Sequence, residues 1–173
     1  MLLTIPGVLE PAEAAECCRR LSDAPWTDGR LTAGAQSAMA KANLQLPEDA
    51  PQARAVSELI LERLSRNPAF VSAALPAQVF PPLFNRYDVG MGFGDHIDNA
   101  IRTGGEPLRR YRTDLSCTLS LSSPADYDGG ELIIRTARGE EAVRSGKACG
   151  TAVAFRLHGS PRGARRRTQW CQP

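Results

Sequence analysis

The strongest constraint on the fold is a change of pattern near residue 76. Before it, apolar residues recur at helical spacing in two stretches, residues 11–22 and 51–66, and each stretch opens with a proline. From Phe80 onward the chain consists of short runs typical of strands, separated by Gly, Pro or Asp. Helices followed by many short strands favour an α+β fold whose C-terminal half is a jelly roll or barrel.

The same pattern predicts the individual elements. We expect helices over residues 11–22 and 51–66, and a short helical or irregular piece over 70–75. In the helix 11–22 the apolar stripe is expected to comprise Ala14, Ala15, Cys18 and Leu21. In the helix 51–66 it is expected to comprise Ala55, Leu59, Ile60 and Leu64. Strands are expected over residues 5–9, 83–89, 94–97, 115–122, 131–135, 142–143 and 151–155.

Length and charge narrow the class of protein. The 173 residues suit one structural unit, with an N-terminal helical region at 1–76 and a second domain at 77–173. A net charge of +2 gives no strong attraction to nucleic acid or membranes. The N-terminus lacks a basic region and a long apolar stretch, so no signal peptide or membrane span is expected. Five cysteines without CxxC spacing predict reduced thiols and a cytoplasmic protein.

The string His96-Ile97-Asp98 is the main candidate for chemistry. In a strand, residues two apart point to the same side, so the imidazole and the carboxylate lie next to each other. They would form two thirds of the 2-His-1-carboxylate triad that binds Fe(II), and His158 is the chain's other histidine. A hydrogen-bonded pair on a half-buried strand is the competing interpretation of so short a motif.

Two other groups of polar residues admit a functional interpretation. Gln36, Lys41 and Asn43, in the polar stretch 25–46, are candidates to face a substrate, although a solvated surface is the favoured interpretation. The arginines of residues 109–112 and 162–167 are candidates for phosphate contact. With little aromatic interleaving and a low net charge, we favour a solvated or partner-facing basic surface and expect no nucleic-acid partner.

Several strings together resemble a known family. IPGVLEPAEA, WTDGRLTAGAQ, PLFNRYDVGMGFGDHIDNAIR and RTDLSCTLSLSSPADYDGGELII follow one another in the order and spacing of the bacterial PKHD-type hydroxylases. These are prolyl-4-hydroxylase-like members of the Fe(II)/2-oxoglutarate-dependent dioxygenases. The resemblance covers residues 2 to about 143. It implies an oxidoreductase in which N-terminal helices pack on a double-stranded β-helix.

The resemblance also implies the cofactors and the reaction. Fe(II) is the metal, 2-oxoglutarate and O2 are co-substrates, and L-ascorbate assists. Decarboxylation of 2-oxoglutarate would be coupled to hydroxylation of a C–H bond. The substrate would be a small molecule or a peptide, with a prolyl or amino-acid-like group as a compatible target. The resemblance is compatible with an oligomer.

Site residues carry over position by position. His96 and Asp98 match the iron ligands, and His158 falls where the distal histidine is expected. The string Arg162-Gly163-Ala164-Arg165 matches an Arg-Gly-x-Arg string, which assigns the 2-oxoglutarate carboxylate to Arg165, with Arg166 as the second candidate. Tyr87 is a candidate to donate a hydrogen bond into the same pocket, and a core position suits it equally well.

The tail departs from the family pattern. After Gly146 the chain is shorter around His158 than its relatives, and Arg165, Arg166 and Arg167 occupy positions where apolar alternation is expected. We therefore expect a C-terminally truncated dioxygenase domain. The alternative function is a β-helix binding module whose catalysis is impaired by the altered tail.

Overall fold

The computed structural model describes residues 2–32, 38–104, 107–136, 139–143, 150, 152–156 and 165–171. Beyond Ile134 it describes the backbone of the strands together with Gly150. The helices are α1 (Pro11–Ser22), the 3-10 helix η1 (Gly29–Thr32), α3 (Pro51–Arg66) and α4 (Pro68–Ala74). The strands are β1 (Leu2–Ile5), β2 (Thr27–Asp28), β3 (Lys41–Ala42), β4 (Leu44–Gln45), β5 (Asn85–Arg86), β6 (Gly92–Ile97), β7 (Ile101–Gly104), β8 (Arg109–Arg112), β9 (Leu115–Leu119), β10 (Asp128–Thr136), β11 (Gly139–Val143), β12 (Ala152–Arg156) and β13 (Arg165–Cys171).

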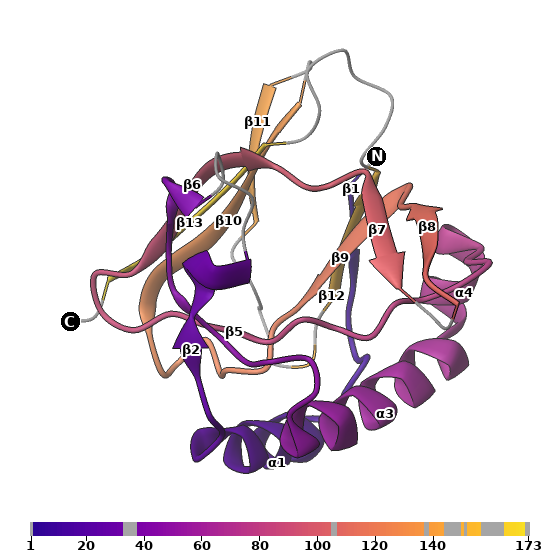
Figure 1. Cartoon of the computed structure of the whole chain (residues 1–173), viewed down its shortest axis with the longest axis horizontal. Coiled ribbons are helices and arrows are strands. Elements are labelled where there is room, and N and C mark those ends of the chain that lie inside the picture. Colours follow the sequence, from indigo (N-terminus) through magenta and orange to yellow (C-terminus); the bar gives the residue numbers. More distant parts are fainter. Residues whose placement is uncertain are drawn as a thin grey trace.

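The strands form antiparallel sheets. One sheet has five strands in the order β11-β10-β13-β6-β3, and another has three in the order β1-β12-β9. A second three-stranded sheet, β2-β4-β5, and the hairpin β7-β8 complete the strand pairing of the described residues. Figure 1 shows the first two sheets on opposite sides of the molecule, with α1 and α3 together below them. The α+β prediction is confirmed, and the antiparallel sheets are consistent with a jelly roll.

The two long helices begin and end where the sequence predicts. A proline at the first position of each helix has no N–H to leave unpaired and a backbone angle already suited to the helix. At the start of α1, the Glu10 N–H donates to the Glu13 carboxylate at 3.0 Å. Asn67 ends α3 and caps α4, because its side chain accepts a hydrogen bond from the Phe70 N–H at 3.0 Å.

The buried faces of these helices differ from the predicted stripes. In α1 the buried residues are Ala14, Cys17 and Leu21. In α3 they are Ala53, Val56, Ser57, Ile60 and Leu64. The predicted positions Ala15 and Ala55 are exposed. Both helices carry small apolar residues on either side of the stripe, so the neighbouring elements decide which arc is covered.

The core joins the helices to the strand β1 and the turn after it. Ile5, Val8 and Leu9 belong to the same buried cluster as the inner faces of α1 and α3, and Leu119 at the end of β9 packs against it. Strands β1 and β3, from the first 76 residues, pair with β12 and β6 from the later part of the chain. None of the helices in the described ranges carries an apolar stretch long enough to cross a membrane.

Some predicted strands are shorter or shifted. The strand expected over 5–9 is β1, Leu2–Ile5, because the N–H groups of Val8 and Leu9 donate to the Gly150 carbonyl at 2.9 and 3.2 Å instead of to a ladder. The strand expected over 83–89 is reduced to β5. Strand β6 includes the whole of the predicted 94–97 segment. The hairpin β7–β8 was not predicted.

Candidate metal and substrate site

His96 and Asp98 lie side by side at the end of β6, as the two-residue alternation predicts. The distance from His96 Nε2 to Asp98 Oδ1 is 3.3 Å, and the two side chains are 9% and 20% exposed. The imidazole is therefore largely removed from water, while the carboxylate remains within its reach. Such a pair can hold a cation between its nitrogen and its oxygen.

The orientation of the imidazole is fixed from two sides. His96 Nδ1 lies 2.8 Å from the Gly94 carbonyl oxygen, which accepts a hydrogen bond when the proton is on Nδ1. The Phe93 ring stacks on the imidazole with centroids 3.5 Å apart and an interplanar angle of 6°. With Nδ1 donating, the Nε2 lone pair faces the Asp98 carboxylate. A hydrogen bond from the second ring nitrogen to a carbonyl is typical of metal-binding histidines.

The donor set fits a divalent metal. Adjacent ligands at about 2.1 Å from a metal in octahedral geometry are about 3 Å apart, close to the spacing of this nitrogen and oxygen. Within the described part of the chain, no third His, Cys, Asp or Glu joins them in a cluster. His158, the predicted third ligand, lies outside the described residues. The structure thus presents two of the three predicted ligands together.

The predicted co-substrate arginines lie on the strand that pairs with the His96 strand. Strand β13 lies next to β6, with Arg165 opposite Ile97 and Arg166 opposite His96. Residues directly opposite each other on antiparallel strands share a face of the sheet. The backbone register therefore aligns position 166 with the His96 face. Tyr87 follows β5 and is partly buried, in the part of the chain next to the sheet β2-β4-β5.

The interpretation of residues 41 and 43 as solvated is wrong. Lys41, Asn43 and Gln45 are 8%, 3% and 3% exposed. Lys41 Nζ donates to Gln45 Oε1 at 2.7 Å, and Asn43 Nδ2 donates to Asn85 Oδ1 at 3.0 Å. Gln45 was not among the predicted residues, although polar residues at 41, 43 and 45 form a period-two pattern that indicates it. Gln36 lies outside the described residues.

Lys41 lies close to the His96–Asp98 pair. It is opposite Phe93 in the β3–β6 pairing, and its Nζ is 5.5 Å from the centroid of the Phe93 ring. Burial lowers the pKa of Lys41, and the negative charge of Asp28 raises it in part. Hydrogen bonds from Arg30 lower the pKa of Asp28 to about 2, so this carboxylate already has a cationic partner.

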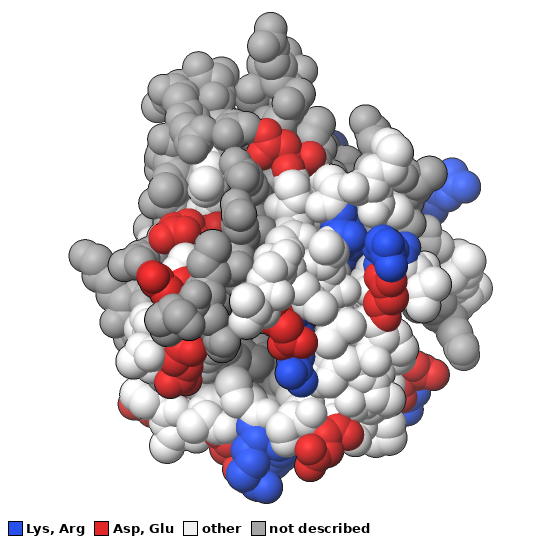
Figure 2. Space-filling view, turned by 90° about the vertical axis from the view of Figure 1, so that its left-hand side faces the viewer, with Lys and Arg blue, Asp and Glu red and all other residues white. Residues whose placement is uncertain are grey.

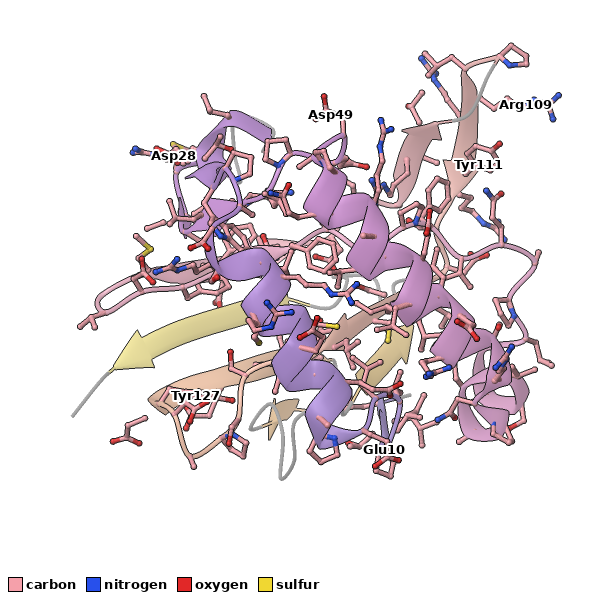
Figure 3. The ribbon with its side chains drawn as sticks, turned by 90° about the horizontal axis from the view of Figure 1, so that it is seen from below. Glu10, Asp28, Asp49, Arg109, Tyr111 and Tyr127 are labelled. Carbon is pink, nitrogen blue, oxygen red and sulfur yellow. The ribbon has the colours of Figure 1, made fainter. Side chains whose placement is uncertain are left out.

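The basic hairpin β7–β8 begins directly after the motif. Its base is closed by Thr113, whose N–H donates to the Ala100 carbonyl and whose hydroxyl donates to the Asn99 carbonyl, at 2.9 and 2.8 Å. Figure 3 shows Arg109 at one corner of the molecule, away from α1. The Tyr111 ring packs edge-on against Phe80, with ring centroids 5.2 Å apart. Among the described residues on the face seen in Figure 2, basic and acidic side chains are interspersed and form no continuous basic field.

A hollow of about 310 Å³ lies elsewhere, between α3 and the segment Pro81–Pro82. Leu46, Ala53 and Phe84 contribute to its mainly apolar lining. None of the described residues assigned to the metal or the co-substrate lines it. It is therefore distinct from the His96–Asp98 site.

The fold is similar to that of a solved prolyl-4-hydroxylase. The structure is similar to the crystal structure of a Pseudomonas putida prolyl-4-hydroxylase, with a TM-score of 0.63 and 18% identity, over 99% of this chain and 87% of that one. No family model matches the chain.

Curated relatives identify the family. A PKHD-type hydroxylase of Caulobacter vibrioides is 52% identical over 155 residues, which is 90% of this chain and 67% of the relative. Relatives with the same designation in Gluconobacter oxydans and Xanthomonas campestris are 56% and 54% identical, over 83% of this chain and 63% and 64% of their own lengths. The chain belongs to the PKHD-type hydroxylases and spans about two thirds of the length of these relatives. The family resemblance is confirmed.

Proposed function

We propose that this chain is an Fe(II)- and 2-oxoglutarate-dependent hydroxylase. The observation that carries the proposal is the His96–Asp98 pair, with its two donor atoms 3.3 Å apart at the end of a strand. Membership of the PKHD-type hydroxylases supports an oxygenase. The double-stranded β-helix covered by helices, which the family resemblance implies, is the architecture proposed to carry the site.

His96 and Asp98 would hold the metal, with His158 as the proposed third ligand. When bound, Fe(II) with 2-oxoglutarate and O2 supplies the oxidising power for hydroxylation of a C–H bond, with ascorbate assisting. The protein's own contribution is to fix the ligands. The Gly94 carbonyl oxygen holds Nδ1, and the Phe93 ring restricts rotation of the imidazole. The low exposure of His96 keeps water from one side of the site.

An arginine of β13 is proposed to bind the distal carboxylate of 2-oxoglutarate. The match to the Arg-Gly-x-Arg string favours Arg165, whereas the register opposite His96 favours Arg166. A planar guanidinium suits a carboxylate because it donates two parallel hydrogen bonds. If the register determines the role, Arg166→Ala should raise the dissociation constant of 2-oxoglutarate about tenfold or more, and Arg165→Ala should change it far less. Calorimetric titration of the Mn(II)-loaded variants measures the dissociation constant of 2-oxoglutarate for each. A larger increase for Arg165→Ala than for Arg166→Ala would show that the Arg-Gly-x-Arg match, and not the register, identifies the binding arginine.

Metal binding is the direct test of the site. Asp98→Ala should abolish binding of one Mn(II) per chain, because a carboxylate oxygen is removed from the donor set. Asp95→Ala is the matched control, since Asp95 is an exposed acid on the same strand but out of phase with the ligands. Mn(II) electron paramagnetic resonance measures free and bound metal. Equal loss of binding in both variants would contradict the assigned ligand face.

Turnover separates the proposed hydroxylase from the alternative binding module. The enzyme should form succinate from 2-oxoglutarate when Fe(II), ascorbate and O2 are present, and the Asp98→Ala variant should not. A chain that binds Mn(II) and 2-oxoglutarate but forms no succinate would support the binding module. The substrate class, a small molecule or a peptide, is then decided by which compound is hydroxylated.

A further inference from the structure

A row of three buried polar side chains lies beside the proposed metal site and takes no part in it. Lys41 in β3, Asn43 directly after it and Gln45 in β4 are each two residues apart, and Lys41 Nζ donates to Gln45 Oε1 at 2.7 Å. Strand β3 pairs with β6, which carries Phe93 and His96. The Phe93 ring stacks on the His96 imidazole and also lies 5.5 Å from the Lys41 ammonium nitrogen. Lys41, the first residue of the row, therefore lies one aromatic ring away from His96.

Lys41 is a buried cation without an anionic partner among the described residues. It donates one hydrogen bond, to the neutral amide oxygen of Gln45. An ammonium group has three N–H donors, and burying its charge without a counter-charge is costly. Asp28, which acts on it from a distance, is held by Arg30 with an Nε–Oδ2 distance of 2.9 Å. The uncompensated charge suits an anion that enters from outside the chain.

Asn43 provides an independent observation of the same kind. Its Oδ1 atom is buried and has no hydrogen-bond partner among the residues that the structure describes, while its Nδ2 donates to Asn85. Buried amide oxygens are nearly always hydrogen-bonded in folded proteins. Gly29 lies against this atom, and a Cβ at position 29 would be 2.0 Å from Asn43 Oδ1 and 3.0 Å from Lys41 Cε. A residue without a side chain at position 29 is therefore needed for the Asn43 amide and the Lys41 side chain to take these positions.

The use of lysine at this position is itself informative. The sequence has two lysines, Lys41 and Lys147, and its other Lys/Arg residues are all arginines. A lysine ammonium is compact and can enter a buried site as a point charge, whereas a guanidinium requires a larger planar space. At this buried position the cation is therefore the smaller of the two groups.

We propose that Lys41, Asn43 and Gln45 form the wall that recognises the prime substrate, with Lys41 binding a carboxylate and Asn43 accepting from an adjacent N–H or O–H group. The substrate class is then a carboxylic acid with a neighbouring donor, such as an N-acylated amino acid or the C-terminal end of a peptide. The inference rests on the proposed hydroxylase function, because it assigns these residues to the substrate of that reaction.

The test uses the metal-free full chain, so that it does not depend on iron binding. Lysine labelled with ¹³C at Cε gives two lysine signals in the NMR spectrum, and the Lys41→Met variant identifies that of Lys41. Titration with N-acetylglycine, which carries a carboxylate next to an N–H, should move the Lys41 signal to saturation. The Lys147 signal serves as the internal reference. The methyl ester of N-acetylglycine, which lacks the charge, should leave the Lys41 signal in place.

Variants and competitors decide between the sources of the carboxylate. Asn43→Leu should weaken N-acetylglycine binding about tenfold, because the donor loses its acceptor. No movement of the Lys41 signal, or equal movement with the ester, would overturn the proposal. A third outcome is that 2-oxoglutarate moves the Lys41 signal to saturation and N-acetylglycine only competes with it. The carboxylate bound by Lys41 would then belong to the co-substrate, and the proposal would be overturned as well. Loss of Mn(II) binding in a parallel sample would refute the metal site without affecting the outcome of this titration.

Discussion

Gly150 connects three parts of the chain, and replacing it by alanine should destabilise the fold strongly. Its N–H donates to the Ser120 carbonyl at 2.8 Å, just beyond β9, and its carbonyl accepts from the N–H groups of Val8 and Leu9. Its φ is +77°, in the left-handed region that favours glycine. A Cβ at this position would lie 2.1 Å from the Leu9 carbonyl oxygen. Because that atom belongs to the backbone, it cannot move aside as a flexible side chain would.

The magnitude follows from these contacts. A non-glycine residue in the left-handed region costs about 1–2 kcal/mol. Displacing the backbone to relieve the clash would weaken hydrogen bonds worth roughly 1 kcal/mol each. We therefore expect Gly150→Ala to lower the free energy of unfolding by about 3–5 kcal/mol. That is a large fraction of the roughly 5–15 kcal/mol available to a typical domain.

Gly7→Ala is the matched control. Gly7 also has a positive φ, +64°, but an added Cβ there would meet nothing within 4 Å. It should cost only the conformational part, about 1–2 kcal/mol. Urea unfolding followed by tryptophan fluorescence measures both variants, since Trp26 is anchored by its indole N–H to the Leu21 carbonyl at 2.9 Å. If the two variants lose the same free energy within about 0.5 kcal/mol, the clash with Leu9 is not decisive.

Three further predictions concern single side chains. Arg63 hydrogen-bonds to Glu13 at 2.6 Å and lowers the pKa of Glu13 below its ordinary 4.5, so the pair stabilises the fold above that pH and its contribution is lost as the pH falls. Arg63→Met should therefore flatten the decline of unfolding free energy below about pH 4.5 in acid titrations, and an unchanged decline would contradict this assignment. Lys41→Met should raise the free energy of unfolding by roughly 1 kcal/mol in urea because it removes a buried charge, and a marked loss would show that the ammonium is structural. Phe93→Leu should weaken Mn(II) binding severalfold because the His96 imidazole loses its stacking partner, while unchanged Mn(II) affinity would show that Gly94 alone orients the ring.

Features that depend on local geometry were predictable from the sequence. A proline sets the start of both α1 and α3, and Asn67-Pro68 ends α3. These signals are local, because the restricted φ and the missing N–H of proline act within a few residues. The period of two in a strand likewise puts His96 and Asp98 side by side. The family was recognisable because whole strings occur in order.

Other features depend on which distant segments meet, and these only the tertiary structure decided. The alternation of Lys41, Asn43 and Gln45 is the same on a solvated edge as on an inner wall, and their burial follows from the pairing of β3 with β6 and of β4 with β5. The hydrogen bonds from Val8 and Leu9 to Gly150 cut β1 short, although residues 5–9 have the pattern of a strand. The position of Arg166 opposite His96 is set by the register of two strands about seventy residues apart. Periodicity specifies which side chains share a face, but the free energy of burial depends on the partner that covers that face.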